Sequence, residues 1–287
     1  MRSIKVGTGA TAKKQETRHL WLVEHRDGES FAVRKINTQF VPVGEAAVVD
    51  RETLLAEYFP EVELYNSRIK PAMASLDNTL EVADGHLDNH EPLSAEMEYS
   101  KALDVDERNV RATFGLGLVY LGRNDLDKSR LIFDELLTMD AVFENRHKHL
   151  FNEFGINLRK SGLFDEAVRY YSRALEINGD LYGEDENLYY NLARANYEKG
   201  EWKPCVEFAA RALAVSPAHE PALVLCRLAV ALGAKTSLLA KYGKPSVPAE
   251  AAVRAAELLG LSGGDHQPVV EAVTKAAGQD IDLSLGM

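Results

Sequence analysis

Three short motifs combine residue types that could perform chemistry. The first, Gly260-Leu-Ser-Gly-Gly264 with Asp265 and His266 beside it, matches the G-x-S-x-G pattern of a nucleophilic serine. Such a serine needs a sharp turn between a strand and a helix on a parallel sheet. An Ala-rich helical stretch precedes this motif, and no β-α-β pattern lies near it. We therefore expect no nucleophile here.

The other two motifs concern metal and nucleotide binding. His86, Asp88 and His90 are side chains that Zn²⁺ accepts as ligands, but they fall in a predicted turn, where polar residues are expected anyway. The segment 7–12 has the glycine spacing of a dinucleotide-binding loop, yet no crossover helix and second parallel strand follow it. We expect no metal, no cofactor and no catalytic residue, so the chain is predicted not to be an enzyme.

A fourth pattern favours recognition instead of catalysis. Tyr190, Asn191, Arg194 and Tyr197 are separated by steps of one, three and three residues, which puts them on one side of a helix. Tyr and Arg are frequent among residues that dominate binding energy, and an Asn amide can hydrogen-bond an extended peptide. The alternative interpretation is an ordinary solvated helix face.

Small residues recur at regular intervals through the middle of the chain. They indicate a series of packed helices, one of which would present this face. Equivalent positions, at intervals of 34, 38, 38 and 34 residues, hold Ala83, Gly117, Gly155, Ala193 and Arg227. A second motif begins 12 residues after each of the first four, in the forms Ala95-x3-Tyr99-x2-Ala102, Ser129-x3-Phe133-x2-Leu136, Ala167-x3-Tyr171-x2-Ala174 and Cys205-x3-Ala209-x2-Ala212. Small residues at a regular interval indicate repeated close approaches between helices.

These motifs and their spacing resemble the tetratricopeptide repeat (TPR) family. The resemblance implies an all-α superhelix of about four and a half helical hairpins, which bury a continuous core and leave a concave groove. It also implies that the first helix of each hairpin contacts the ligand. The implied partner-binding residues are Asn152, Arg159, Tyr190, Asn191, Arg194 and Tyr197, with Arg111 and Phe114 from the second repeat. The carboxylate clamp of chaperone-binding members is not reproduced, because Phe114 and Leu118 occupy two of its positions.

The sequence predicts separate segments before and after the repeats. Residues 1–18 are predicted to be a flexible basic arm, and residues 19–60 a small α+β module with a β-hairpin across Asp27-Gly28 and a helix capped by Asp50. Residues 61–234 form the predicted superhelix. Residues 235–287 are predicted to be capping helices and a loose tail, because the preceding helix, 221–232, is apolar nearly all round and must be covered.

Composition narrows the class of partner. Lys and Arg number 33 against 44 Asp and Glu, which gives a net charge of −11. An acidic surface repels nucleic-acid phosphates, so nucleic acid is not the expected ligand. The sequence has no apolar run long enough for a membrane span and no secretory segment. With Cys205 and Cys226 at packing positions, we expect a cytoplasmic protein with reduced thiols.

The sequence therefore predicts a protein–protein interaction scaffold or adaptor that holds a peptide or helix of a partner protein in the groove. Two alternatives stay open. One is a structural TPR protein that self-assembles into a homo-oligomer and fills the groove with its own termini. The other is a regulatory subunit of an enzyme complex that docks through residues 19–60. The identity of the partner does not follow from the sequence.

Overall fold

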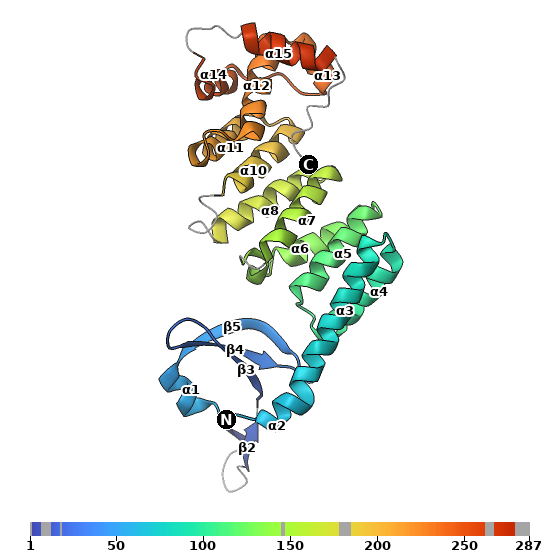
Figure 1. Cartoon of the computed structure of the whole chain (residues 1–287), viewed down its shortest axis with the longest axis vertical. Coiled ribbons are helices and arrows are strands. Elements are labelled where there is room, and N and C mark those ends of the chain that lie inside the picture. The colour runs from blue at the N-terminus through green and yellow to red at the C-terminus, as the bar shows by residue number, and fades with distance from the viewer. Residues whose placement is uncertain are drawn as a thin grey trace. The chain divides into compact units, whose positions relative to one another are not determined.

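The computed structural model describes residues 2–6, 13–17, 19–144, 147–177, 185–261 and 267–278. The chain divides into two compact units, residues 1–142 and 143–287. Helices make up most of both units, and the strands belong to the first (Figure 1). The predicted fold, a TPR array with a small N-terminal strand module and C-terminal helices, is confirmed. Every helix of the described ranges is too short or too polar to cross a membrane.

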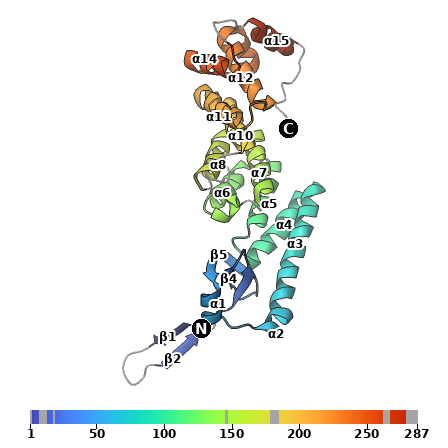
Figure 2. The ribbon, with the colours of Figure 1, turned by 60° about the vertical axis from the view of Figure 1, so that its left-hand side comes forward.

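The first unit begins with a two-stranded antiparallel sheet. Strand β1 (Arg2–Val6) pairs with β2 (Lys13–Thr17), and Figure 2 shows the two side by side. These strands were not expected, because the sequence predicts a flexible arm over residues 1–18. The glycine motif at 7–12 lies outside the described residues. The predicted boundary after residue 18 stays a prediction.

A three-stranded antiparallel sheet follows, in the order β3-β4-β5. The predicted hairpin is confirmed: β3 (Trp21–His25) pairs with β4 (Ser30–Ile36), and Gly28 in the turn has a positive φ of 65°. Strand β5 (Pro42–Asp50) was missed, since proline and glycine weaken a strand pattern. Pro42 is tolerated because it is the first residue of an edge strand, opposite Ile36.

Helix α1 (Arg51–Glu57) begins where the sequence predicts. The Asp50 carboxylate accepts a hydrogen bond of 2.7 Å from the Thr53 amide, which caps the helix. None of the residues of α1 is buried, and Leu55 is 69% exposed. Helix α1 therefore contributes little to the buried core of the module. Just after it, the ring of Tyr58 packs edge-on against Trp21, with centroids 6.2 Å apart.

The next helix is continuous through a proline, Pro71. A short turn, α2 (Val62–Leu64), leads through a π-helical turn, η2 (Tyr65–Ile69), into α3 (Lys70–Asp88). A proline has no amide hydrogen to donate to the carbonyl four residues earlier, and its ring crowds that carbonyl. The wider π turn directly before Pro71 accommodates this defect, so the helix continues through it.

Two helical hairpins complete the first unit, and two open the second. The first unit has α3 with α4 (Pro92–Val105), and α5 (Val110–Gly122) with α6 (Leu126–Leu136). A 3-10 turn, η3 (Asp140–Phe143), spans the boundary between the units in the sequence. The second unit then has α7 (Lys148–Lys160) with α8 (Phe164–Ile177), and α10 (Glu186–Lys199) with α11 (Trp202–Val215). These four pairs confirm the predicted hairpins to within a few residues. Gly162 and Gly200 have positive φ angles of 77° and 81° in the turns, as expected.

The loop after β4 fastens the sheet to the first hairpin. The Asn37 amide donates a hydrogen bond of 2.7 Å to the carbonyl oxygen of Val105, at the end of α4. The Gln39 amide donates to the carbonyl oxygen of Asp104 at 3.1 Å. The last carbonyls of a helix have no partner within the helix, so these side chains satisfy them. The α+β module is therefore packed onto the repeats of its own unit.

The second unit ends in helices that cover the last repeat. Helix α12 (Glu220–Ala234) has eight buried residues. The helices α14 (Ala249–Leu258) and α15 (Gln267–Gly278) pack against it, as the apolar sequence of α12 predicts (Figure 1). In the sequence between α12 and α14, the short helix α13 (Ser237–Tyr242) leads into residues 243–247, which we call the strap. The indole of Trp202 donates a 3.0 Å hydrogen bond to the Pro245 carbonyl, which holds the strap on α11.

Candidate partner-binding site

Four charged side chains meet where α7, α10 and the strap come together. The Glu198 carboxylate lies at the centre of this group, which we call the α7–α10 cluster: Arg159, Arg194, Glu198 and Lys244. Arg194 donates to Glu198 Oε1 from Nε at 2.9 Å and approaches it with Nη2 at 2.8 Å. Lys244 of the strap reaches Glu198 Oε2 at 3.0 Å. Arg159 Nη1 lies 3.9 Å from Oε1, an ion pair without a hydrogen bond.

Burial and charge both act on this cluster. Burial lowers the pKa of the Arg159 guanidinium, and the neighbouring charge of Arg194 lowers it further. Burial raises the pKa of Glu198, but Arg194 and Lys244 outweigh burial, so the pKa of that carboxyl ends below its usual range. The side chains of Arg159, Arg194 and Lys244 are only 17%, 16% and 9% exposed. Glu198 is thus ionised at neutral pH and surrounded by cations.

The uncharged residues expected at this face are partly accessible. Asn152 on α7 and Tyr190 and Asn191 on α10 are all half-buried. The Tyr190 ring packs against His219, which precedes α12, with centroids 5.3 Å apart. Burial raises the pKa of Tyr190, so its hydroxyl is protonated at neutral pH and can donate a hydrogen bond. The structure therefore brings Arg159, Arg194 and Tyr190 together, as the repeat register predicts.

Two of the expected contact residues are buried. Tyr197 is only 6% exposed, because the Lys244 ammonium lies 4.3 Å above its ring and Trp202 packs edge-on against it. Phe114 is fully buried in α5, a helix with buried residues on every side. The expectation that these two side chains are exposed to a partner is wrong. The apolar sequence around Phe114 carried a signal for burial, since a helix that is apolar all round is covered.

Arg111 lies in the first unit and has a structural partner. Its guanidinium binds Asp84 of α3 through two nitrogens, with Nε 2.9 Å from Oδ2. The Tyr99 hydroxyl donates to the other oxygen of Asp84 at 2.5 Å. Arg111 therefore links the first two hairpins, and its carboxylate partner is already supplied by the chain.

Lys244 was not predicted as part of the site. It lies outside the repeats and 46 residues from Glu198 in the sequence. Repeat register assigns a face only to residues within the repeats, so no signal of this kind marks a lysine on a connecting segment. The path of the strap is what brings Lys244 next to Glu198.

The histidine candidate for a metal site forms an ion pair instead. His86 Nδ1 pairs with Glu91 Oε2 at 2.5 Å. Within the described ranges, no three His, Cys, Asp or Glu residues come close enough to hold a metal ion. The possible nucleophile Ser262 and its neighbours Asp265 and His266 lie outside the described residues. Cys205 and Cys226 are buried free thiols, and burial raises the pKa of the Cys226 thiol to about 12.

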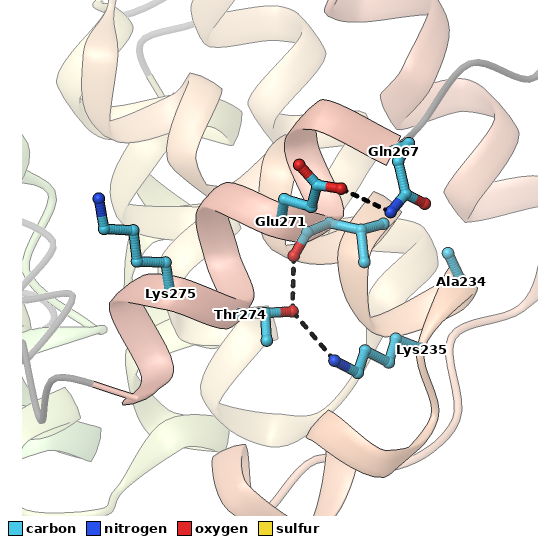
Figure 3. Close-up of a pocket in the computed structure, with 7 residues that line it drawn as sticks. Ala234, Lys235, Gln267, Glu271, Thr274 and Lys275 are labelled. Carbon is cyan, nitrogen blue, oxygen red and sulfur yellow. Dashed lines mark hydrogen bonds between the residues drawn. The ribbon is translucent and has the colours of Figure 1, made fainter.

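A surface depression beside α15 has a volume of about 560 Å³ (Figure 3). Three of its polar side chains already donate to partners within the chain. The Gln267 amide donates to Glu271 at 2.7 Å, the Thr274 hydroxyl donates to the Val270 carbonyl at 2.6 Å, and Lys235 reaches Thr274 at 3.5 Å. Lys275 points away from this group in Figure 3. The depression therefore has no arrangement of groups aimed at a ligand.

The sequence profile described as tetratricopeptide repeat matches residues 80–142 and 152–220. The chain therefore contains tetratricopeptide repeats. These two stretches contain the helices from the end of α3 to the beginning of α12, so the profile and the observed hairpins agree. TPR proteins are typically non-catalytic scaffolds for protein interaction. No curated protein sequence matches this chain.

Solved TPR structures resemble the array. The TPR-like repeats of a kinesin light chain candidate from Podosopora anserina align with 72% of this chain and 97% of their own, at 14% identity and a TM-score of 0.43. YrrB, described as a TPR protein with an unusual peptide-binding site, aligns with 68% of this chain and 90% of its own, at 21% identity and a TM-score of 0.40. PilF of Pseudomonas aeruginosa aligns with 71% of this chain and 88% of its own, at 19% identity and a TM-score of 0.41.

Proposed function

We propose that the chain is an adaptor whose second unit binds a peptide or helix of a partner protein on the first helices α7 and α10. The observation that carries the proposal is the set of half-buried polar side chains there, Asn152, Tyr190 and Asn191, beside the α7–α10 cluster. Aromatic, amide and cationic groups suit an interface that exchanges water for a protein ligand.

The residues have distinct roles in this proposal. The amides of Asn152 and Asn191 hydrogen-bond the ligand backbone, since each amide offers two donors and one acceptor oxygen. Tyr190 supplies an apolar ring, held by His219, and a hydroxyl donor. The two buried free thiols suit a cytoplasmic place of action.

The test is quantitative affinity capture from a lysate of the native cell, followed by mass spectrometry. Wild type is compared with Asn152→Ala/Asn191→Ala and with Tyr190→Ala. Replacing Tyr190 should weaken binding about thirtyfold, or ~2 kcal/mol, if it is a binding hot spot. Asn157→Ala is the matched control, because its amide bonds the Glu153 carbonyl within α7. Equal capture by all four proteins would contradict the proposed surface.

Self-association is tested separately. Light scattering of the purified chain over a hundredfold range of concentration measures whether its mass grows. A constant monomer mass would exclude the structural alternative in which the chain assembles with itself. A mass that grows, and that drops to the monomer value in Asn152→Ala/Asn191→Ala, would identify the partner as a second copy.

A further inference from the structure

The α7–α10 cluster has more positive than negative charge. Its three cations, Arg159, Arg194 and Lys244, share one carboxylate, Glu198. All three cationic side chains are less than a fifth exposed. A partly buried charge without a counter-charge is costly, because it loses hydration without gaining an ion pair. The chain tolerates here an excess of two positive charges, although its overall net charge is −11.

The hydrogen-bonding capacity of the cluster is also incomplete. Glu198 occupies Nε and Nη2 of Arg194, whereas Nη1 of Arg194 is buried and has no partner among the described residues. Arg159 approaches Glu198 only to 3.9 Å, beyond hydrogen-bond distance. Buried donors in proteins are nearly always satisfied, so a buried guanidinium nitrogen without an acceptor requires an explanation. An acceptor from outside the chain supplies one.

Resting on the proposed function, we infer that the α7–α10 cluster binds the side-chain carboxylate of an internal Asp or Glu in the partner peptide. The planar guanidinium groups match the two oxygens of a carboxylate, and hydrogen bonds between ionised groups are the strong ones. The acidic surface of the whole chain disfavours polyanions such as nucleic acid. Lys244 makes the strap part of this site, because its ammonium binds Oε2 of Glu198, whereas the two arginines lie at Oε1.

The carboxylate of Glu198 has two effects in this inference. It orients Arg194, and it also competes with the ligand for the same cations. Neutralising Glu198 therefore strengthens, or leaves unchanged, the binding of an acidic peptide, whereas neutralising Arg159 or Arg194 weakens it. A cluster that served stability alone would not change peptide affinity in opposite directions for the two kinds of variant.

The experiment selects random dodecapeptides on the full wild-type chain, with each peptide fused through its C-terminus so that only side chains offer carboxylates. The selected peptides should be enriched in Asp and Glu over the starting library. Synthesised with amidated C-termini, they should bind Arg159→Gln and Arg194→Gln roughly tenfold or more weakly, as expected for lost charged hydrogen bonds. Glu198→Gln should bind them at least as tightly as wild type.

Two controls keep the result interpretable. Arg173→Gln removes an arginine of α8 that pairs with Glu176 and should leave affinity unchanged. Arg159→Gln removes the 3.9 Å ion pair with Glu198 but no side-chain hydrogen bond within the described ranges, so its thermal melt should stay close to that of wild type even if Arg194→Gln unfolds more easily.

The outcomes separate this inference from the proposed function. Selected peptides without acidic enrichment, bound equally by Arg159→Gln and wild type but lost on Asn152→Ala/Asn191→Ala, would overturn the inference and leave the proposed surface standing. Peptides insensitive to both sets of variants, or a selection that yields no binder, would overturn both.

Discussion

The ring of Tyr171 packs directly on the backbone of Gly155. A β-carbon built at Gly155 would lie 2.4 Å from Tyr171 Cζ and 2.5 Å from its hydroxyl oxygen. Tyr171 is buried and packs edge-on against Phe151, with ring centroids 5.6 Å apart. The absence of a side chain on Gly155 is therefore what lets α7 and α8 approach around this ring.

Gly155→Ala should destabilise the second unit by about 1–3 kcal/mol, because even one methyl group overpacks the crossing. The matched control is Gly85→Ala in α3, where a β-carbon meets nothing within 4 Å. The free energy of unfolding of that variant should rise by up to about 1 kcal/mol, because alanine has a better helix propensity than glycine. Urea unfolding measures both. A Gly155→Ala curve that overlays wild type would show that Tyr171 moves aside without cost.

The strap gives a second pair of matched glycines. Gly200 and Gly162 both have positive φ at the end of a first helix, but only Gly200 faces the strap, where a β-carbon would lie 2.7 Å from the Pro245 ring. Gly162→Ala should cost about 1–2 kcal/mol, the penalty for a left-handed backbone. Gly200→Ala should cost at least about 1 kcal/mol more, because the strap must also shift. If thermal melts show the same loss of stability for both variants, the strap moves away from the added methyl group without an energetic cost.

The repeats could be predicted because each close helix crossing requires small residues, and the sequence shows them. The hairpin across Asp27-Gly28 and the cap at Asp50 were equally local signals. Strand β5 gave no such local signal, because a proline and a glycine, Pro42 and Gly44, weaken a strand pattern. Such residues fit only a strand that is irregular and lies at the edge of a sheet. The ladder with β4 does shift register between Val33 and Lys35.

The candidate site was only partly predictable for a different reason. A repeat register places Arg159, Tyr190 and Arg194 on one side, but it carries no information about what covers that side. Tyr197 was assigned to the exposed stripe and is instead covered by Lys244. That contact joins segments 47 positions apart in the sequence, and the path of the strap that makes it follows from no local pattern.

The covering role of the C-terminal helices predicts the behaviour of a shortened chain. Helix α12 has buried residues all round, including Leu225, Leu228 and Leu232, and α14 and α15 pack on it. A chain that ends at Ala234 loses this cover and exposes a contiguous apolar surface. It should aggregate or dimerise on light scattering at concentrations where the full chain does not. A monomeric, soluble 1–234 chain would contradict the covering role.

The carboxylate of Glu198 predicts a pH dependence of stability. Its pKa in the folded chain is held below its usual range by Arg194 and Lys244, although burial opposes them. An unfolded glutamate titrates near pH ~4.3. The stabilisation by Glu198 is therefore fully present above about pH 4.3 and is lost as the pH falls through the lower pKa of the folded state.

Glu198→Gln tests this sign directly. The variant should be less stable than wild type by about 1–3 kcal/mol at neutral pH, because Arg194 and Lys244 lose their charged acceptor. The difference should stay constant from pH 7 to about 5 and shrink in more acidic solution, where the wild-type carboxyl also becomes neutral. Glu176→Gln is the control, since Glu176 is 66% exposed in an ion pair with Arg173, and exposed pairs contribute little. A difference that persists undiminished at pH 3 would mean that the geometry of the amide, and not the charge of Glu198, accounts for the loss.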